Sequence, residues 1–201
     1  MTPSTLYRYA GCAGLASAAI LLVNAARRAD LLPETAFTHA IAPFAALLGL
    51  LAITGFYLWQ REPAGLLGTI GFALNFAGLA GALAIEYAIH FFFPYLTAQT
   101  RDDLLAGPAA TRLVATSAIF IVGVGTFAAA MWRAGAFPRT AIALYVVGFV
   151  PVALRAAVPL PVYLAGLVLA AGVVAWLSLI LLRAPVGDRL RGRLAAGAAV
   201  A

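Results

Sequence analysis

Lysine is absent from this 201-residue sequence, and all 13 of its basic side chains are arginine. A retinal Schiff base needs a lysine amine, so a rhodopsin-type photoreceptor is excluded. A phosphate-binding P-loop is excluded too, because its motif contains a lysine that reaches the phosphates. Charged residues of any kind are scarce, at 10% of the chain, whereas soluble domains carry about 25%. The sequence therefore lacks the charged surface that is typical of a soluble domain.

Cysteine occurs once, as Cys12, so neither an intramolecular disulfide nor a cysteine-based metal cluster can form. The motif Gly-x-Ser-x-Gly is missing, and Ser17, Ser117 and Ser178 have no histidine near them in sequence. No catalytic residue is therefore assigned. The sequence does not settle whether the chain is an enzyme, and it favours a protein without enzymatic activity.

Hydrophobic residues make up 64% of the chain, more apolar surface than a soluble fold of this size can bury. A helix needs about 20 apolar residues to cross a bilayer, and the stretches between charges have this length. We expect one all-α domain, residues 1–186, forming a polytopic transmembrane bundle of six helices, followed by a basic tail, residues 187–201. The expected spans are residues 9–26, 36–58, 64–93, 113–132, 139–157 and 161–182. Residues 1–26 also admit interpretation as a cleaved signal peptide, with Arg8 in its n-region.

The positions of the arginines predict the orientation, because cytoplasmic loops are enriched in positive charge. With both termini inside, the cytoplasmic side collects Arg8, Arg61, Arg133, Arg139, Arg183, Arg189, Arg191 and Arg193. The outer side holds Arg27, Arg28, Arg101, Arg112 and Arg155 mixed with Asp30, Glu34, Asp102 and Asp103. Trp59 and Trp132 are expected at the inner interface. We therefore predict a multi-pass protein of a bacterial cytoplasmic membrane, N-in and C-in.

Partners are predicted from the same pattern. The lipid bilayer surrounds the spans, and the arginine-rich tail is expected to attract anionic lipid. Nucleic acid is excluded as a partner, because the arginines sit between apolar spans and serve as topology signals. A homo-oligomer or a partner subunit in the membrane remains open.

The third span carries polar and small residues on one helical face, at steps of three or four. They are Gly71, Asn75, Gly78, Ala82, Glu86 and His90. Small residues let another helix approach closely, so we expect this helix to be central in the bundle. Its charged end faces the outer leaflet, where Asn24, His39 and Arg155 are also expected.

Four interpretations of these polar residues compete. In the first, Glu86, Arg155, Asn75, Asn24 and His90 line an outward-facing pocket that binds or transports a small solute, with Glu86 and Arg155 as an ion pair. In the second, the same pair only packs, and the chain is a structural or accessory subunit of a membrane complex. In the third, Glu86, His90 and His39 bind a metal such as zinc. In the fourth, His39 and His90 are axial ligands of a haem.

The hairpin from Trp132 to Arg139, between Gly- and Ala-rich spans, resembles a pattern found in uncharacterised multi-span integral membrane proteins of high-GC bacteria. This resemblance implies no activity. Six spans in about 200 residues, with the stripe Ala10, Gly14 and Ala18 on the first, are also similar to the substrate-binding subunits of vitamin uptake transporters. That resemblance implies a small-residue face presented to a partner protein.

Overall fold

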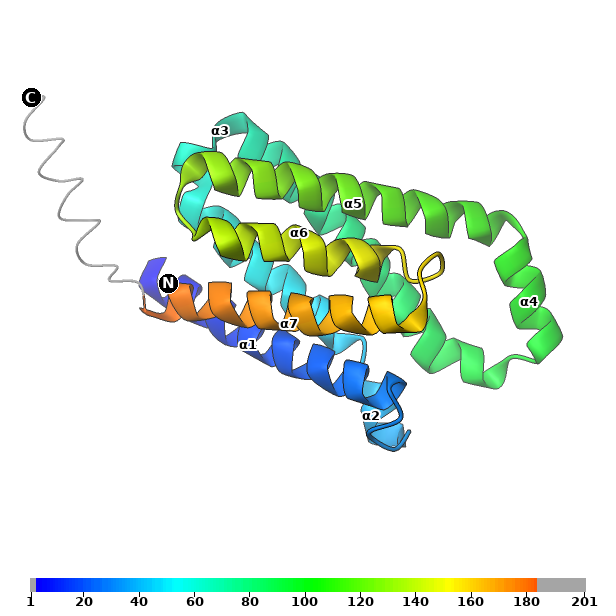
Figure 1. Cartoon of the computed structure of the whole chain (residues 1–201). Coiled ribbons are helices and arrows are strands. Elements are labelled where there is room, and N and C mark those ends of the chain that lie inside the picture. The colour runs from blue at the N-terminus through cyan, green and yellow to red at the C-terminus, as the bar shows by residue number, and fades with distance from the viewer. Residues whose placement is uncertain (1–2, 184–201) are drawn as a thin grey trace, which may run out of the picture.

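The computed structural model describes residues 3–183, and all regular secondary structure in this part of the chain is helical (Figure 1). The predicted all-α fold is confirmed there. The predicted tail, residues 187–201 with Arg189, Arg191 and Arg193, lies outside the described residues. The helices are α1 (Pro3–Arg28), α2 (Ala36–Ile41), α3 (Phe44–Tyr87), α4 (Ala98–Ala106), α5 (Pro108–Ala134), α6 (Arg139–Ala153) and α7 (Leu160–Arg183), with a π-helical turn (Ala88–Phe92) and a 3-10 turn (Phe93–Tyr95) after α3.

Helix α3 consists of two antiparallel limbs, residues 44–64 and 66–87. The chain reverses at Gly65, whose φ of 57° and ψ of −150° are not helical and whose φ is one that residues with a Cβ rarely adopt. The Tyr57 ring stacks on Phe72 with centroids 4.4 Å apart, and its hydroxyl lies 3.0 Å from the Thr69 hydroxyl. A straight helix would place Tyr57 and Phe72 about 22 Å apart. The two limbs are therefore separate helical segments, at the positions where the sequence predicts two spans.

The six long helical segments run up and down between two ends of the bundle (Figure 1). One end holds the start of α1, the reversal at Gly65, the α5–α6 connection and the last turn of α7. The other, which we call the α2–α4 end, holds α2, α4 and the α6–α7 turn. The arginines within residues 3–183 that were predicted to be cytoplasmic belong to the first end, and those predicted to be outside belong to the α2–α4 end. Which end faces the cytoplasm stays a prediction.

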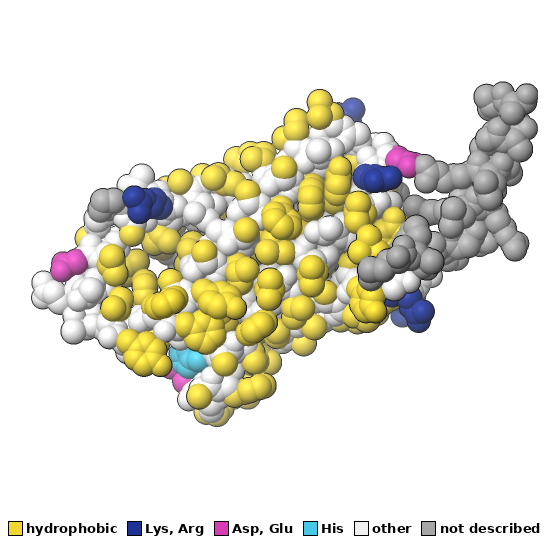
Figure 2. Space-filling view, turned by 180° about the vertical axis from the view of Figure 1, so that it is seen from behind, with side chains coloured by type: hydrophobic (Ala, Val, Ile, Leu, Met, Phe, Trp, Pro, Cys, Tyr) yellow, Lys and Arg dark blue, Asp and Glu magenta, His cyan; other side chains and the backbone are white. Residues whose placement is uncertain are grey.

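Four stretches of residues 3–183 are long and apolar enough to cross a membrane, namely Thr5–Arg28, Ala36–Tyr95, Ala109–Ala134 and Leu160–Arg183. The second of them contains both limbs of α3. Hydrophobic side chains cover most of the face seen in Figure 2, and large ones such as Leu66 and Val114 are more than two-thirds exposed. Water would penalise such a surface and lipid would not, so the fold is compatible with an integral membrane protein.

Helix α6 is shorter than the predicted span at residues 139–157. It has 15 residues and ends at Ala153, with Pro151 in its last turn. Proline removes a backbone donor and does not continue a helix well. At 1.5 Å per residue the helix covers about 22 Å, less than the roughly 30 Å of a hydrocarbon core. Arg155 therefore lies in the α6–α7 turn and not inside a helix. If α6 begins at the inner interface of the membrane, this turn starts before the chain reaches the outer interface.

The second limb of α3 packs closely on α5 through its small residues. A Cβ at Gly71 would lie 2.6 Å from the backbone nitrogen of Phe127, and one at Gly78 would meet the backbone of Phe120. Glycine on α5 does the same in return, because a Cβ at Gly123 would lie 2.5 Å from the carbonyl carbon of Leu74. The predicted small-residue face is thus a helix contact inside the bundle.

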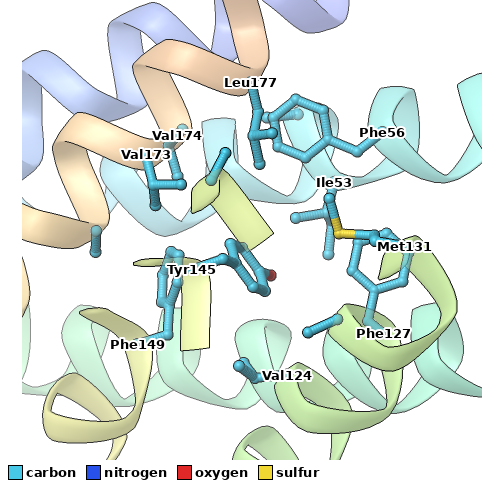
Figure 3. Packing of buried hydrophobic residues seen from close by; sticks show 14 of the residues in the cluster. Ile53, Phe56, Val124, Phe127, Met131, Tyr145, Phe149, Val173, Val174 and Leu177 are labelled. Carbon is cyan, nitrogen blue, oxygen red and sulfur yellow. The ribbon is translucent and has the colours of Figure 1, made fainter. Parts of the chain in front are cut away.

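The core lies between α3, α5, α6 and α7 and is mainly aromatic and aliphatic (Figure 3). Tyr145 and Phe149 of α6 stand at its centre, with ring centroids 4.8 Å apart, and Phe127 of α5 meets Tyr145 edge-on. Ile53 and Phe56 reach the same core from the first limb of α3 (Figure 3). The tightly packed core fixes the rotation of each helix about its axis, and so determines which polar residues meet at the α2–α4 end.

The stripe Ala10, Gly14 and Ala18 on α1 is buried within the chain. A Cβ at Gly14 would meet Ser178 of α7 and Ala52 of α3. The expectation that this stripe faces a partner protein is therefore wrong, because the chain's own helices occupy it. The two tryptophans also differ: Trp132 is 46% exposed beside Arg139, as an interfacial anchor would be, whereas Trp59 is buried against Tyr7.

Candidate functional site

Six side chains at the α2–α4 end form one continuous network, which we call the polar cluster. Its members are Arg27 of α1, Glu34 of the following loop, His39 of α2, Glu86 of α3, His90 of the π-helical turn and Arg155 of the α6–α7 turn. These side chains come from three parts of the chain that are far apart in sequence, residues 27–39, 86–90 and 155. Such a network is costly to assemble in an apolar bundle, because every charged group must be desolvated and paired.

Glu86 stands at the centre of the pairing. Its Oε1 accepts a hydrogen bond from an Nη of Arg155 at 2.8 Å, and its Oε2 lies 3.2 Å from Nε2 of His90. The Glu86 side chain is 21% exposed and that of Arg155 is 34% exposed. The Glu86–Arg155 pair predicted from the sequence is therefore present in the structure, and both members are partly accessible from outside the bundle.

His90 lies in the π-helical turn, where the helix widens by one residue before Pro94 ends it. Its side chain is only 2% exposed. Its Nδ1 is 2.9 Å from Nδ1 of His39, which comes from α2. Helix α2 is positioned by a capping box in which Thr35 and Thr38 satisfy each other's backbone N–H groups. The two histidines of the chain are thus in direct contact.

Arg27 is buried, with a side chain that is 3% exposed. One Nη lies 3.3 Å from Oε1 of Glu34 and 3.3 Å from Nε2 of His39. Its neighbour Arg28 turns elsewhere, with its guanidinium 5.5 Å from the centroid of the Tyr163 ring. Within residues 3–183, the carboxylate paired directly with this buried cation is therefore Glu34, whose side chain is 68% exposed, while Glu86 acts on it from farther away.

The contact between the two histidines needs one donor and one acceptor. Their Nδ1 atoms lie 2.9 Å apart, so one Nδ1 carries a proton and the other accepts it. An Nη of Arg27 lies 3.3 Å from Nε2 and 3.5 Å from Nδ1 of His39, so this contact does not distinguish the two nitrogens. A continuous line of polar contacts runs from Arg27 through His39 and His90 to Glu86, where Arg155 donates from the other side.

Asn24 lies one turn before Arg27, on the same face of α1. Its amide nitrogen donates to the carbonyl oxygen of Ala42 at 3.4 Å, which ties α1 to the bend between α2 and α3. The Oδ1 of Asn24 is buried and accepts no hydrogen bond. The Nε–H of Arg27 is also buried and donates none. Asn24 therefore borders the polar cluster, as the sequence predicts for this end of the bundle.

Asn75 does not join the other candidate residues. It is fully buried, and its amide nitrogen donates to the hydroxyl of Tyr145 at 2.6 Å. Along the same helix it lies eleven residues before Glu86, which corresponds to about 16 Å. The predicted pocket of Glu86, Arg155, Asn24, His90 and Asn75 is thus divided into the cluster at the bundle end and a separate polar contact in the core.

The cluster does not fit the predicted metal site. Within residues 3–183, no three His, Cys, Asp or Glu side chains are arranged to hold a metal ion. Both ring nitrogens of His90 are engaged, one by His39 and the other by Glu86, so Glu86 and His39 do not converge on one point. A haem between the histidines does not fit either. The porphyrin would have to lie between two rings whose Nδ1 atoms are 2.9 Å apart.

Sequence reasoning assigned no role in the site to Arg27 or Glu34, and it gave Tyr145 none. Arg27 ends an apolar helix and was placed at the interface, where arginines are ordinarily solvated. Its burial follows from α2 lying against the end of α1, and a six-residue helix leaves no periodic signal. The hydroxyl of Tyr145 had no signal because its partner is 70 residues away in sequence.

Comparison with known proteins provides no family for this chain. No protein-family model, no curated protein and no solved structure matches it. The function is therefore argued from the geometry of the polar cluster.

Proposed function

We propose that this chain is an integral membrane protein that binds a small polar solute through the polar cluster at the α2–α4 end, which faces the outside of the cell. The observation that carries the proposal is the Glu86–Arg155 ion pair, joined to His90 and His39 and partly exposed at the end of the bundle. Ionisable groups inside membrane spans are costly and mark solute or ion sites by default.

The partial exposure of the pair favours binding over packing alone. Glu86 and Arg155 are 21% and 34% exposed, so a solute can reach both members of the pair without opening the bundle. The two histidines add further hydrogen-bonding groups beside the pair. A solute with both donors and acceptors would replace these contacts one by one, and release of such a solute on the opposite side would make the protein a transporter.

Native mass spectrometry and thermal unfolding of the detergent-extracted full chain test the proposal. We expect wild type to carry or respond to a small solute. Glu86→Gln and Arg155→Gln should remove this response while Asp103→Asn and Arg112→Gln retain it, because the latter two residues are exposed outside the cluster. A wild-type protein that carries no solute, responds to none in a screen and instead copurifies with another membrane subunit would contradict the proposal and favour the accessory-subunit hypothesis.

The outward orientation has its own test. In a Cys12→Ala background, Thr100→Cys places a single thiol on α4, whose residues are all exposed or half-exposed. A maleimide that does not cross membranes should label this thiol in intact cells. Labelling that requires permeabilised cells would invert the topology and place the cluster on the cytoplasmic side.

A further inference from the structure

We infer that the solute is an anion, bound by Arg27 through a carboxylate or phosphate group that has a hydrogen-bond donor beside it. This inference rests on the proposed function and specifies its ligand. It starts from a mismatch in the polar cluster: the most buried charge, the guanidinium of Arg27, has the most exposed counterion, Glu34, at 3.3 Å. A solvated carboxylate compensates a buried cation poorly, because water screens it.

Two unpartnered hydrogen-bonding atoms, one on Arg27 and one on Asn24, indicate which kind of ligand the site would bind. Its Nε–H is buried without an acceptor, and Oδ1 of Asn24, one turn earlier on the same face, is buried without a donor. A guanidinium binds carboxylates and phosphates best when two parallel N–H groups, such as Nε–H and one Nη–H, point at two oxygens. In the structure Arg27 offers Glu34 one Nη only. An anionic group would complete the fork.

The unpartnered Oδ1 of Asn24 restricts the chemical class of the ligand further. An acceptor next to the anion site selects ligands that carry a donor close to their negative group. A hydrogen phosphate has such a donor in its P–OH, and a hydroxy acid or amino acid has one beside its carboxylate. A simple carboxylate without a neighbouring donor leaves the Asn24 oxygen unpaired, so it should bind more weakly.

Helix α2 controls access to Arg27. None of its six residues is buried, so little packing is lost when it moves. It is held mainly by the polar contacts of His39 with His90 and Arg27. An anion is a stronger acceptor for a guanidinium than an imidazole ring, so it displaces His39 from Arg27. Glu34 returns to water at little cost, since it is already mostly exposed.

The anionic group has two potential sources, a free solute and the headgroup of an anionic lipid. Both present the same oxygens to Arg27. The lipid source is relevant because two aromatic residues at this end are exposed, Phe92 of the π-helical turn and Tyr95 of the 3-10 turn, as in the aromatic belts of membrane proteins. Two arms of one experiment separate the sources.

In the first arm, the full chain in phosphatidylcholine nanodiscs is titrated with inorganic phosphate and with acetate at constant ionic strength, and the unfolding temperature is followed. We expect both anions to stabilise wild type in a saturable way, with an affinity for phosphate at least tenfold higher than that for acetate. Arg27→Lys keeps the charge but lacks the two parallel N–H groups of the guanidinium, so it should lower the affinity for phosphate at least tenfold. Arg112→Gln, on the exposed side of α5, should not change it. In the second arm, nanodiscs contain phosphatidylglycerol, and native mass spectrometry counts the lipids retained.

Asn24→Asp keeps the inference testable if Arg27 variants do not fold. This nearly isosteric change places a carboxylate one turn from Arg27, where it takes the position of the anion. We expect a protein that no longer responds to phosphate and no longer retains phosphatidylglycerol. Its own unfolding temperature is not the readout, because the change also removes the hydrogen bond from the Asn24 amide to the Ala42 carbonyl oxygen. Retained phosphatidylglycerol without a response to free phosphate would support the inference with a lipid as the source.

Three outcomes overturn the inference in distinguishable ways. If a neutral or cationic solute binds and depends on Glu86 while phosphate, acetate and phosphatidylglycerol do not, the anion is wrong and the proposed function stands. If no solute or lipid of any charge binds, both fall. Equal stabilisation of wild type, Arg27→Lys and Asn24→Asp by phosphate would show a general salt effect and would also overturn it.

Discussion

Adding one methyl group at Gly123 should separate two helices, whereas adding it two residues later should not. Gly123 of α5 faces the second limb of α3, and a Cβ there would lie 2.5 Å from the carbonyl carbon of Leu74 and would also meet the backbone nitrogen of Asn75. Ordinary contact begins at 3.4 Å. Because the opposing atoms are backbone, no side-chain rotation relieves the clash, and the helices must part by roughly 1 Å.

Gly125→Ala is the matched control, because a Cβ at Gly125 has nothing within 4 Å. Both variants gain the same helix propensity, about 1 kcal/mol for Gly to Ala, so this contribution cancels between them. The remaining difference is the overpacking at Gly123, about 1 to 3 kcal/mol. For a chain of this size it corresponds to an unfolding temperature roughly 2 to 12 °C lower for Gly123→Ala than for Gly125→Ala.

Intrinsic fluorescence of the detergent-solubilised variants during heating measures this difference, and size-exclusion chromatography verifies that both are monodisperse before heating. Gly78→Ala should behave like Gly123→Ala, because its Cβ would meet the backbone of Phe120 from the other side of the same contact. Equal unfolding temperatures for Gly123→Ala and Gly125→Ala would refute the direct backbone contact between α3 and α5.

Three further predictions concern polar side chains within the bundle. Gln60 is fully buried with neither amide atom paired, so Gln60→Met should raise the free energy of unfolding by about 1 to 3 kcal/mol; a heat-labile variant would contradict this. Tyr145→Phe leaves the amide of Asn75 without its partner and should lower that free energy by a similar amount, about 1 to 3 kcal/mol in thermal melts; an unchanged melt would mean the bond contributes nothing. Nitrogen-15 NMR of histidine-labelled protein without a histidine tag should find a proton on one of the two Nδ1 atoms and none on the other, because the 2.9 Å contact needs one donor and one acceptor; two unprotonated Nδ1 atoms would refute the hydrogen bond.

The polar cluster has consequences for how mutations in it will behave. Removing Glu86 leaves Arg155 and His90 without their acceptor, so its loss affects two helix connections at once. Conservative variants that retain shape, such as Glu86→Gln, are therefore better probes of binding than truncations. The same argument favours Arg27→Lys over Arg27→Ala, since an alanine would also remove the side chain that joins α1 to α2.

Local and periodic features of the sequence predicted much of the fold. Apolar runs bounded by arginines located six helical segments, because the length of a span and the placement of charge depend only on neighbouring residues. Steps of three or four residues identified Gly71 and Gly78 as a contact face for the same reason. The partnership of Glu86 with Arg155 was also expected, since a charge in an apolar helix has few partners to choose from.

Which side chains actually meet was decided by the tertiary structure. The contact of His39 with His90 spans 51 residues, and that of Asn75 with Tyr145 spans 70. Periodicity identifies the face of a helix but not its neighbour, which depends on how the close glycine contacts rotate each helix against the next. Three differences from the sequence predictions arise in this way: α6 ends early, the small-residue stripe of α1 packs inside the chain, and Arg27 is buried under α2. Each depends on packing contacts between many residues that are distant in sequence.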